Sequence, residues 1–366
     1  MAIPFYSRTC RARPRVRSAL VCFCVFLLHV PAPNAWGAGL SRTNLLEYAE
    51  PDGAVRPVRS IDDWQRRRHG ILLALQEVMG PLPGAEKRCP LDLRILEESD
   101  EGDYFRRDIS YQSEPGARVP AYLLIPKSAP GATKKFPGIL ALHQTHRLGR
   151  KVVVGLGESP NDEYGVELVR RGFVVLAPSY PLLADYNPDL RRLGYSSGTM
   201  KAIRDNIRGL DLLEALPFVK PGKFGAIGHS LGGHNSVYTA VFDARVAAVV
   251  SSCGLDSYLD YMNGDIRGWT SERYMPRLLN YSTAEIPFDF HEMIGALAPR
   301  KCFLVAPLHD SNFKWQSVDA VAREARKIYA LYGRPDDLRV EHPDSGHEFS
   351  KEMREEAFRI FEEVLR

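Results

Sequence analysis

The residues that most directly suggest chemistry lie at positions 228–232, where Gly-His-Ser-Leu-Gly forms a G-x-S-x-G pattern. An apolar run at residues 224–227 predicts a strand before the pattern, and the residues from Leu231 onward predict a helix after it. Between a strand and a helix, the two glycines permit a turn too tight for Cβ atoms on both sides of the serine. The serine then stands at a helix N-terminus, which favours a developing anion. We therefore predict that Ser230 is a nucleophile.

A serine hydroxyl needs a base that takes its proton, and that base needs an acid that orients it. His347 lies in a glycine-containing loop after the last predicted strand, and we predict that it is the base; His342 is its rival, but it lies at the strand end. Asp310 follows the preceding predicted strand and is the predicted acid. Asp256, one strand earlier, remains the alternative acid. The chain order Ser230, Asp310, His347 is a known order for such a triad.

The oxyanion that forms during acyl transfer requires two hydrogen-bond donors. We predict that these are the backbone N–H groups of Leu231 and of Gln144, which follows the third predicted strand. His143, in the same loop, is a candidate substrate contact, although a loop histidine bonded to the backbone explains it equally well. His234, one helical turn after Ser230, is interpreted as structural.

Strands and helices alternate along most of the chain, which predicts a mostly parallel sheet flanked by helices. About eight strands are expected, at residues 103–112, 119–125, 138–142, 173–177, 224–228, 246–251, 302–306 and 338–341. Residues 38–100 are expected to form a helical preamble, with one helix at 61–79, ahead of a catalytic domain at 101–366.

Residues 256–299 interrupt this alternation after the sixth predicted strand, and they are rich in aromatic side chains. A long insertion at this point usually serves a function, so we expect a cap that forms one wall of the substrate site. Trp269, Arg273 and Tyr274 are its candidate substrate contacts. The alternative is that the aromatic residues only attach the insertion to the domain.

The N-terminus has the features of a secretory signal peptide at residues 1–37. Five arginines precede an apolar run at residues 20–30, and the small residues Ala35 and Gly37 follow. Without this segment, which holds five arginines and no acidic residue, the formal net charge of +3 becomes −2. We therefore expect a secreted or periplasmic protein that binds neither nucleic acid nor, after cleavage, a membrane.

No motif of the sequence indicates a metal or a cofactor, so neither is expected. It contains no H-E-x-x-H pattern, no paired cysteines at ligand spacing and no glycine-rich phosphate loop. The expected partner is a small-molecule or carbohydrate ester.

Four segments together resemble the dienelactone hydrolase and acetyl xylan esterase-like branch of the α/β-hydrolases. They are LHQT at 142–145, GHSLGGH at 228–234, PLHD at 307–310 and DSGH at 344–347. The resemblance covers roughly residues 60–366 and implies the α/β-hydrolase fold and ester hydrolysis through an acyl-serine. Dienelactone hydrolase itself uses a cysteine nucleophile, and this chain has Ser230 in its place.

The sequence thus predicts a secreted serine hydrolase that cleaves carboxylic esters, with acylated carbohydrate as the substrate class considered first. Two alternatives stay open. One is a serine peptidase of the prolyl oligopeptidase kind, although the preamble is too short for the propeller that such enzymes usually carry. The other is a binding protein without activity, against which the complete triad pattern argues.

Overall fold

The structure, a computed structural model, describes residues 40–127 and 135–366. The expected signal peptide, residues 1–37, lies outside the described residues. None of the helices in the described ranges is long and apolar enough to cross a membrane.

Within the described residues, nine strands form one sheet in the order β11-β10-β9-β8-β6-β7-β5-β4-β3. Their bounds are β3 Arg94–Asp100, β4 Tyr104–Glu114, β5 Ala117–Pro126, β6 Phe136–Leu142, β7 Val174–Pro178, β8 Val219–His229, β9 Val246–Ser252, β10 Lys301–Val305 and β11 Leu338–Glu341. Six neighbouring strands, β11, β10, β9, β8, β6 and β7, run parallel to one another. The other three pair antiparallel: β5 with β7, β4 with β5, and β3 with β4. A mostly parallel sheet was expected and is confirmed.

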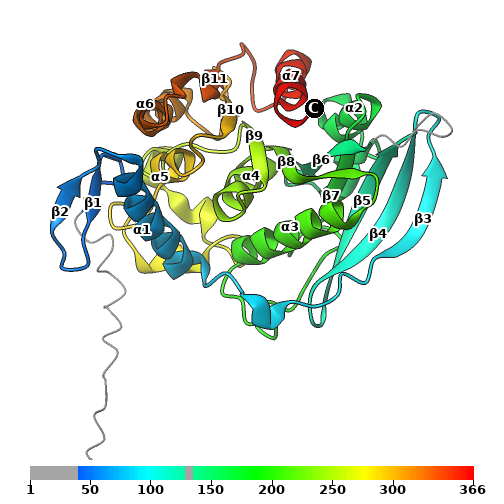
Figure 1. Cartoon of the computed structure of the whole chain (residues 1–366), viewed down its shortest axis with the longest axis horizontal. Coiled ribbons are helices and arrows are strands. Elements are labelled where there is room, and N and C mark those ends of the chain that lie inside the picture. Colours follow the sequence, from blue (N-terminus) through cyan, green and yellow to red (C-terminus); the bar gives the residue numbers. More distant parts are fainter. Residues whose placement is uncertain (1–39, 128–134) are drawn as a thin grey trace, which may run out of the picture. The chain divides into compact units, whose positions relative to one another are not determined.

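Helices cover both faces of this sheet (Figure 1). Their bounds are α1 Ile61–Met79, α2 Tyr164–Arg170, α3 Gly198–Ala215, α4 Leu231–Phe242, α5 Phe290–Gly295, α6 Trp315–Leu331 and α7 Lys351–Leu365. Apolar side chains of α1, α3, α4, α5 and α6 pack into one core, and those of α2 and α7 pack into a second. Successive side chains of a strand point to opposite faces of the sheet. Leu140 of β6 therefore packs into the first core and its neighbour Ile139 into the second.

The sheet has one strand more than the eight that the sequence predicted. The additional strand is β3, which lies at the edge of the sheet and pairs only with β4. Nearly all of its side chains are exposed, so it lacks the apolar pattern that marks a strand in a sequence. A small separate sheet, β1 Glu47–Ala49 with β2 Val55–Pro57, was also not expected in the preamble.

The strand order reverses at β6, which lies between β7 and β8. In open α/β sheets, ligands bind outside the carboxyl ends of the strands next to such a reversal. Gln144 follows the carboxyl end of β6, and Ser230 follows the carboxyl end of β8. The topology therefore brings the loop that carries Gln144 and the turn that carries Ser230 to the same edge of the sheet.

Residues 256–299 contain three short 3-10 helices, η4 Tyr261–Gly264, η5 Ile266–Trp269 and η6 Pro276–Asn280, followed by α5. Polar contacts, one of them buried, join this insertion to the N-terminal part of the chain. Arg67 of α1 forms an ion pair with Glu292, both almost completely buried, and Arg277 and Tyr281 hydrogen-bond to Glu77. Figure 1 shows α1 beside this segment.

Candidate active site

The side chains of Ser230, His347 and Asp310 form one hydrogen-bonded chain. Ser230 Oγ lies 3.0 Å from His347 Nε2. On the other side of the ring, His347 Nδ1 lies 2.9 and 3.0 Å from the two carboxylate oxygens of Asp310. With Nδ1 donating to the carboxylate, Nε2 is left as an acceptor for the serine proton, as general base catalysis requires.

The backbone of the turn explains the glycines around Ser230. Ser230 has φ 53° and ψ −118°, a strained conformation for a residue other than glycine. A Cβ on Gly228 would lie 2.2 Å from the backbone of Gly232, and a Cβ on Gly232 would lie 1.8 Å from the carbonyl oxygen of Leu142. Larger residues at 228 and 232 would therefore force the strand and the helix apart.

Asp310 is held in place by its own loop. Its Oδ1 accepts hydrogen bonds from the backbone N–H groups of Asn312 and Phe313, at 2.7 and 3.2 Å. Burial alone would raise the pKa of Asp310, but the hydrogen bond and charge of His347 and these two amides outweigh it and lower the pKa. The carboxylate thus stays ionised beside the imidazole.

Two backbone hydrogen bonds join the loop of Asp310 to the loop of His347. Leu308 N donates to Pro343 O at 3.0 Å, and His309 N donates to Ser345 O at 3.1 Å. The ring of His229 packs against the ring of His347 with centroids 4.8 Å apart. The imidazole is therefore fixed both by its acid and by its neighbours.

The alternative acid, Asp256, lies elsewhere in the same region. Its Oδ2 accepts from the backbone N–H of Lys314 at 3.1 Å, and its Oδ1 has no partner among the described residues. Burial raises the pKa of Asp256 to about 7. The carboxylate that hydrogen-bonds to His347 Nδ1 is therefore that of Asp310, as predicted, and not that of Asp256.

The two predicted oxyanion donors lie on segments that touch. The close approach of Gly232 to the carbonyl of Leu142 brings the start of α4 against the end of β6. Leu231, directly before Gly232, and Gln144, two residues after Leu142, are therefore next to this contact in the chain. Neither N–H group is used in a turn, loop or cap hydrogen bond of the described residues. Both remain available as donors.

His143 does not have the position expected of a substrate contact. Its side chain is buried, its Nε2 accepts from the backbone N–H of Tyr180 at 3.0 Å, and its Nδ1 donates to the carbonyl of Gln144 at 2.8 Å. Burial lowers the pKa of His143 to about 4, so the ring is neutral. Because both nitrogens are occupied by backbone groups, this side chain orients the Gln144 loop and offers no free atom to a ligand.

A wall of aromatic rings extends from His347 toward the Gln144 loop. It consists of Phe313, Trp269, His234 and Tyr274, which we call the ring wall. Neighbouring centroids lie 6.1 Å apart for His347 and Phe313, 6.4 Å for Phe313 and Trp269, 4.8 Å for Trp269 and His234, and 5.8 Å for His234 and Tyr274.

The far end of the ring wall approaches the oxyanion donors. Tyr274 Oη lies 3.5 Å from Thr145 Oγ1, directly after Gln144. Arg273, the third expected contact in the insertion, is partly buried, and its Nε donates to the carbonyl of Leu182 at 3.2 Å. The insertion thus contributes Trp269 and Tyr274 to the ring wall, whose Phe313 contacts His347.

The sequence interpretation missed Asn312, whose side chain lies next to the base. Its Nδ2 is 3.5 Å from His347 Nε2, on the nitrogen that faces Ser230. A local sequence signal could have pointed to it. An aspartate often accepts a hydrogen bond from the backbone N–H two residues later, and Asn312 stands at that position after Asp310.

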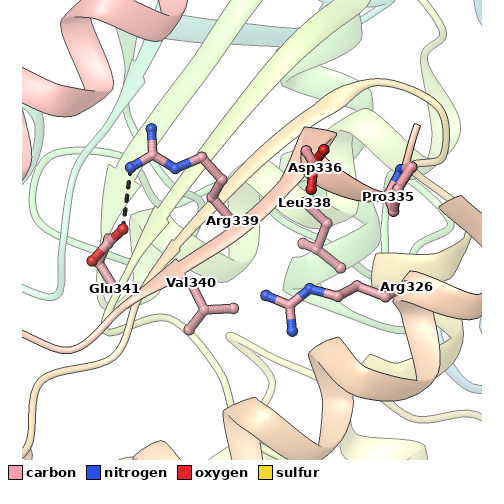
Figure 2. A pocket seen from close by; sticks show the side chains of 7 residues that line it. All are labelled: Arg326, Pro335, Asp336, Leu338, Arg339, Val340 and Glu341. Carbon is pink, nitrogen blue, oxygen red and sulfur yellow. Dashed lines mark hydrogen bonds and ion pairs between the residues drawn. The ribbon is translucent and has the colours of Figure 1, made fainter. Parts of the chain in front are cut away.

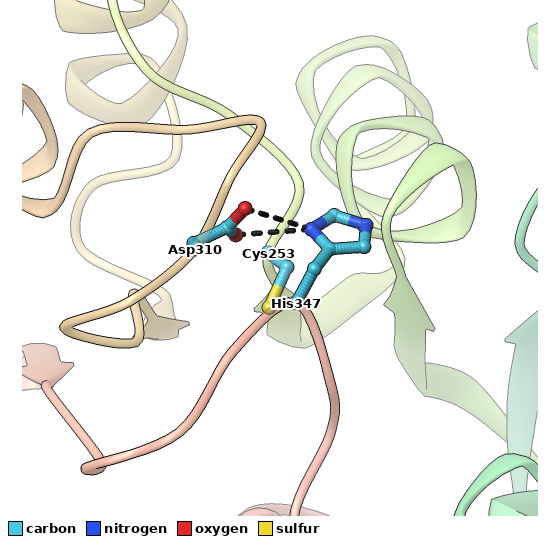
Figure 3. Close-up of side chains that lie close together, drawn as sticks. All are labelled: Cys253, Asp310 and His347. Carbon is cyan, nitrogen blue, oxygen red and sulfur yellow. Dashed lines mark hydrogen bonds and ion pairs between the residues drawn. The ribbon is translucent and has the colours of Figure 1, made fainter.

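A thiol also lies beside the triad (Figure 3). Within the described residues, a sulfur of Cys253, a carboxylate oxygen of Asp310 and a ring nitrogen of His347 all lie within 4.8 Å of one another. These are atoms of the kinds that bind metals. Burial and the charge of Asp310 raise the pKa of the Cys253 thiol, and Asp310 and His347 already hydrogen-bond to each other, which is the arrangement that a triad uses.

Two surface cavities lie away from these residues. The larger, of ≈ 380 Å³, is lined by Arg326, by β11 and by residues just before it (Figure 2). The smaller, of ≈ 210 Å³, lies beside Gly116 and residues 186–193. Neither is lined by a residue of the triad or of the ring wall.

Alanine substitutions separate a role in the site from a role in packing within the insertion. Tyr274 is half-buried at the ring wall, so Tyr274→Ala should change KM or substrate preference while the melting temperature barely moves. Phe288 is fully buried against Tyr258, so Phe288→Ala should cost about 3–5 kcal/mol and lower the melting temperature by several degrees. Enzyme kinetics and thermal melts check both. If both variants changed stability alone, the insertion would serve packing only.

Comparisons with known proteins place this geometry in a family. The model of the prolyl oligopeptidase family matches residues 162–362, more than half of the chain, and this range includes Ser230, Asp310 and His347. The protein YtaP of Bacillus subtilis (strain 168), which is named as a hydrolase, is 24% identical over 303 residues, covering 80% of this chain and 97% of YtaP.

Solved structures show the same fold. A glucuronoyl esterase from Solibacter usitatus superimposes with a TM-score of 0.68 at 18% identity, covering 88% of this chain and 97% of that one. A protein from Bacteroides fragilis described as an acetyl xylan esterase superimposes with a TM-score of 0.56 at 19% identity, covering 77% and 76%. The predicted α/β-hydrolase fold is thereby confirmed, and the chain is an α/β-hydrolase that belongs to the prolyl oligopeptidase family.

Proposed function

We propose that this protein is a serine esterase that cleaves carboxylic esters through an acyl-serine intermediate. The observation that carries the proposal is the chain of hydrogen bonds from Ser230 through His347 to Asp310. The unused N–H groups of Leu231 and Gln144 add to it the donors that a tetrahedral intermediate needs.

In the proposed acylation step, Ser230 Oγ attacks the ester carbonyl carbon while His347 Nε2 takes the hydroxyl proton. The carbonyl oxygen becomes an oxyanion, and the N–H groups of Leu231 and Gln144 donate to it. His347 then gives the proton to the alcohol oxygen as the bond from carbon to that oxygen breaks. Asp310 stabilises the imidazolium throughout, which its lowered pKa favours because the carboxylate stays charged.

In the proposed deacylation step, water takes the place of the alcohol. His347 Nε2 accepts a proton from the water as its oxygen attacks the acyl carbon, and the same N–H groups stabilise the second oxyanion. Collapse of this intermediate breaks the bond to Ser230 Oγ, which recovers its proton from His347. The products are the free acid and the regenerated enzyme.

For the substrate, we propose an acylated carbohydrate in the extracellular or periplasmic space. The similar folds of proteins named glucuronoyl esterase and acetyl xylan esterase support the carbohydrate class. The basic and apolar pattern of residues 1–37 supports export. The ring wall places aromatic rings with a few polar atoms next to His347, which is the usual composition of a small-ligand site.

A second candidate, peptide hydrolysis, is favoured by membership in the prolyl oligopeptidase family. Both candidates use the same triad, and the leaving group separates them. Purified protein lacking residues 1–37 should be assayed on p-nitrophenyl esters, acetylated sugars and p-nitroanilide peptides. Esterase function predicts turnover of the esters with little or none of the anilides, whereas the opposite preference would reject it.

A fluorophosphonate probe tests the nucleophile independently of any substrate. The probe should add its mass to the peptide that contains Ser230, and the label should be absent in Ser230→Ala. A folded protein that remains unlabelled would instead support the inactive binding protein.

A further inference from the structure

Three side-chain nitrogens in the ring wall are buried and form no hydrogen bond of ordinary geometry with the described residues. They are both ring nitrogens of His234 and Nε1 of Trp269. The side chains of His234 and Trp269 are only 4% and 3% exposed, and their rings are in contact with centroids 4.8 Å apart. Most buried polar atoms in proteins have a partner, so a group of unpaired ones beside a catalytic residue calls for an explanation.

The position of the pair relative to the nucleophile is fixed by α4. His234 lies one helical turn after Ser230, and its backbone N–H donates to the carbonyl of Ser230 at 3.2 Å. Trp269 lies between His234 and Phe313, which in turn contacts His347. The unpaired nitrogens therefore lie where α4, which carries His234, meets the insertion, which carries Trp269.

The chemistry of these nitrogens defines what would satisfy them. Burial lowers the pKa of His234 to about 3, so the ring is neutral and has one N–H donor and one acceptor. The backbone of Gly254 interacts with the ring and opposes this shift weakly, but it does not meet the geometry of a hydrogen bond. Trp269 Nε1 only donates. A carboxylate accepts but does not donate, and an alkyl group does neither. A hydroxyl group does both, and so it matches donors and an acceptor placed side by side.

We propose that His234 and Trp269 form a subsite that binds a hydroxylated group of the ester, as on a sugar ring. This inference rests on the proposed esterase function and adds to it a specificity site, with His234 as a substrate contact rather than the structural residue that the sequence suggested. The hydroxylated group lies on the alcohol or on the acyl side of the ester, and the two sides give different substrates.

The test compares hydroxylated esters with a plain ester in three variants. His234→Phe and Trp269→Phe remove the unpaired nitrogens and keep an aromatic ring. The matched control is Tyr258→Phe, which removes a buried hydroxyl that does have a partner, the hydroxyl of Tyr238 at 3.0 Å. The substrates are an acetylated methyl xyloside, methyl glucuronate and p-nitrophenyl acetate, which has neither sugar hydroxyl.

We expect His234→Phe and Trp269→Phe each to lower kcat/KM for one hydroxylated ester about tenfold or more relative to p-nitrophenyl acetate. A tenfold change corresponds to the loss of about one hydrogen bond. The xyloside would place the hydroxylated group on the alcohol side, and the glucuronate would place it on the acyl side. Tyr258→Phe should leave these ratios unchanged. Unchanged ratios in both nitrogen-removing variants would overturn the subsite while leaving esterase function intact.

Stability gives a second readout that does not depend on activity. Removing a buried polar atom with a partner should lower the melting temperature, as in Tyr258→Phe, whereas His234→Phe should leave it unchanged or raise it. A fall in His234→Phe as large as in Tyr258→Phe would mean that its nitrogens serve the fold, and would overturn the proposal.

Calorimetry separates the subsite from the reaction. Ser230→Ala protein should bind the acetylated xyloside or the glucuronate ester, and adding His234→Phe should weaken that binding about tenfold. If Ser230→Ala binds neither compound, the subsite is refuted whatever the esterase assays show.

Discussion

Ser230→Ala is expected to lower kcat for ester hydrolysis by at least about three orders of magnitude, since loss of a triad serine removes the nucleophile and leaves only the contribution of the oxyanion donors and of binding. The fold should remain, because alanine fits where serine does and Ser230 Oγ hydrogen-bonds only to His347 among the described residues. Kinetics with p-nitrophenyl acetate and a thermal melt measure both effects.

The matched control for this variant is Ser236→Ala in the same helix. Ser236 is fully buried, and its hydroxyl donates to the carbonyl of Gly232 at 2.8 Å. This control should lower stability slightly and keep activity. Retention of more than a tenth of the wild-type turnover by Ser230→Ala would sink the assignment of the nucleophile.

The second large effect is expected for Asp310→Asn, which should lower kcat by about three to four orders of magnitude. Oδ1 of the new side chain would still accept from the N–H groups of Asn312 and Phe313. Its NH₂ group would then face His347 Nδ1, where it can only donate. The imidazole would place its proton on Nε2, and it could no longer accept the proton of Ser230.

Asp256→Asn is the matched control, because Asp256 is the other buried carboxyl at the end of a neighbouring strand. An asparagine oxygen can still accept from Lys314 N, so activity should fall little. If Asp256→Asn abolished activity and Asp310→Asn did not, the triad would use the acid one strand earlier.

The same control variant has a signature in the pH dependence of stability. Because the pKa of Asp256 is raised to about 7 in the fold, the folded protein holds this proton more tightly than the unfolded chain does. The wild type therefore loses stability as pH rises from about 4 to about 7, and Asp256→Asn removes that loss. Urea unfolding should show the variant gaining on the wild type over this range; a constant difference would contradict the raised pKa.

Much of the fold was predictable because its elements have strong local patterns. The helix predicted at residues 61–79 has those bounds as α1, and the helix predicted from Leu231 onward begins there as α4. The triad was predictable for a related reason. The turn at Ser230 needs its glycines whatever the rest of the chain does, and the strand ends that carry Asp310 and His347 are visible as short apolar runs.

Local patterns failed where a residue's role depends on its neighbours in space. The strand β3 is exposed on nearly all its length, so only its hydrogen bonds to β4 reveal it. His143 has the sequence position of a ligand contact, but the N–H of Tyr180 and the carbonyl of Gln144 occupy both of its nitrogens. Asn312 reaches His347 only because two loops are joined by backbone hydrogen bonds.

The sequence by itself therefore determined the α/β-hydrolase fold and the nucleophile and base of the candidate triad, because a strained turn and buried strands leave few residue types possible. Only the tertiary structure decided which acid meets His347 and which rings of the insertion stand beside Ser230. It also decided which buried nitrogens, those of His234 and Trp269, lack a hydrogen-bond partner in the part of the chain that the structure describes. These outcomes depend on contacts between segments far apart in the chain, and the satisfaction of a hydrogen bond is a property of the pair, which neither residue's own position reveals.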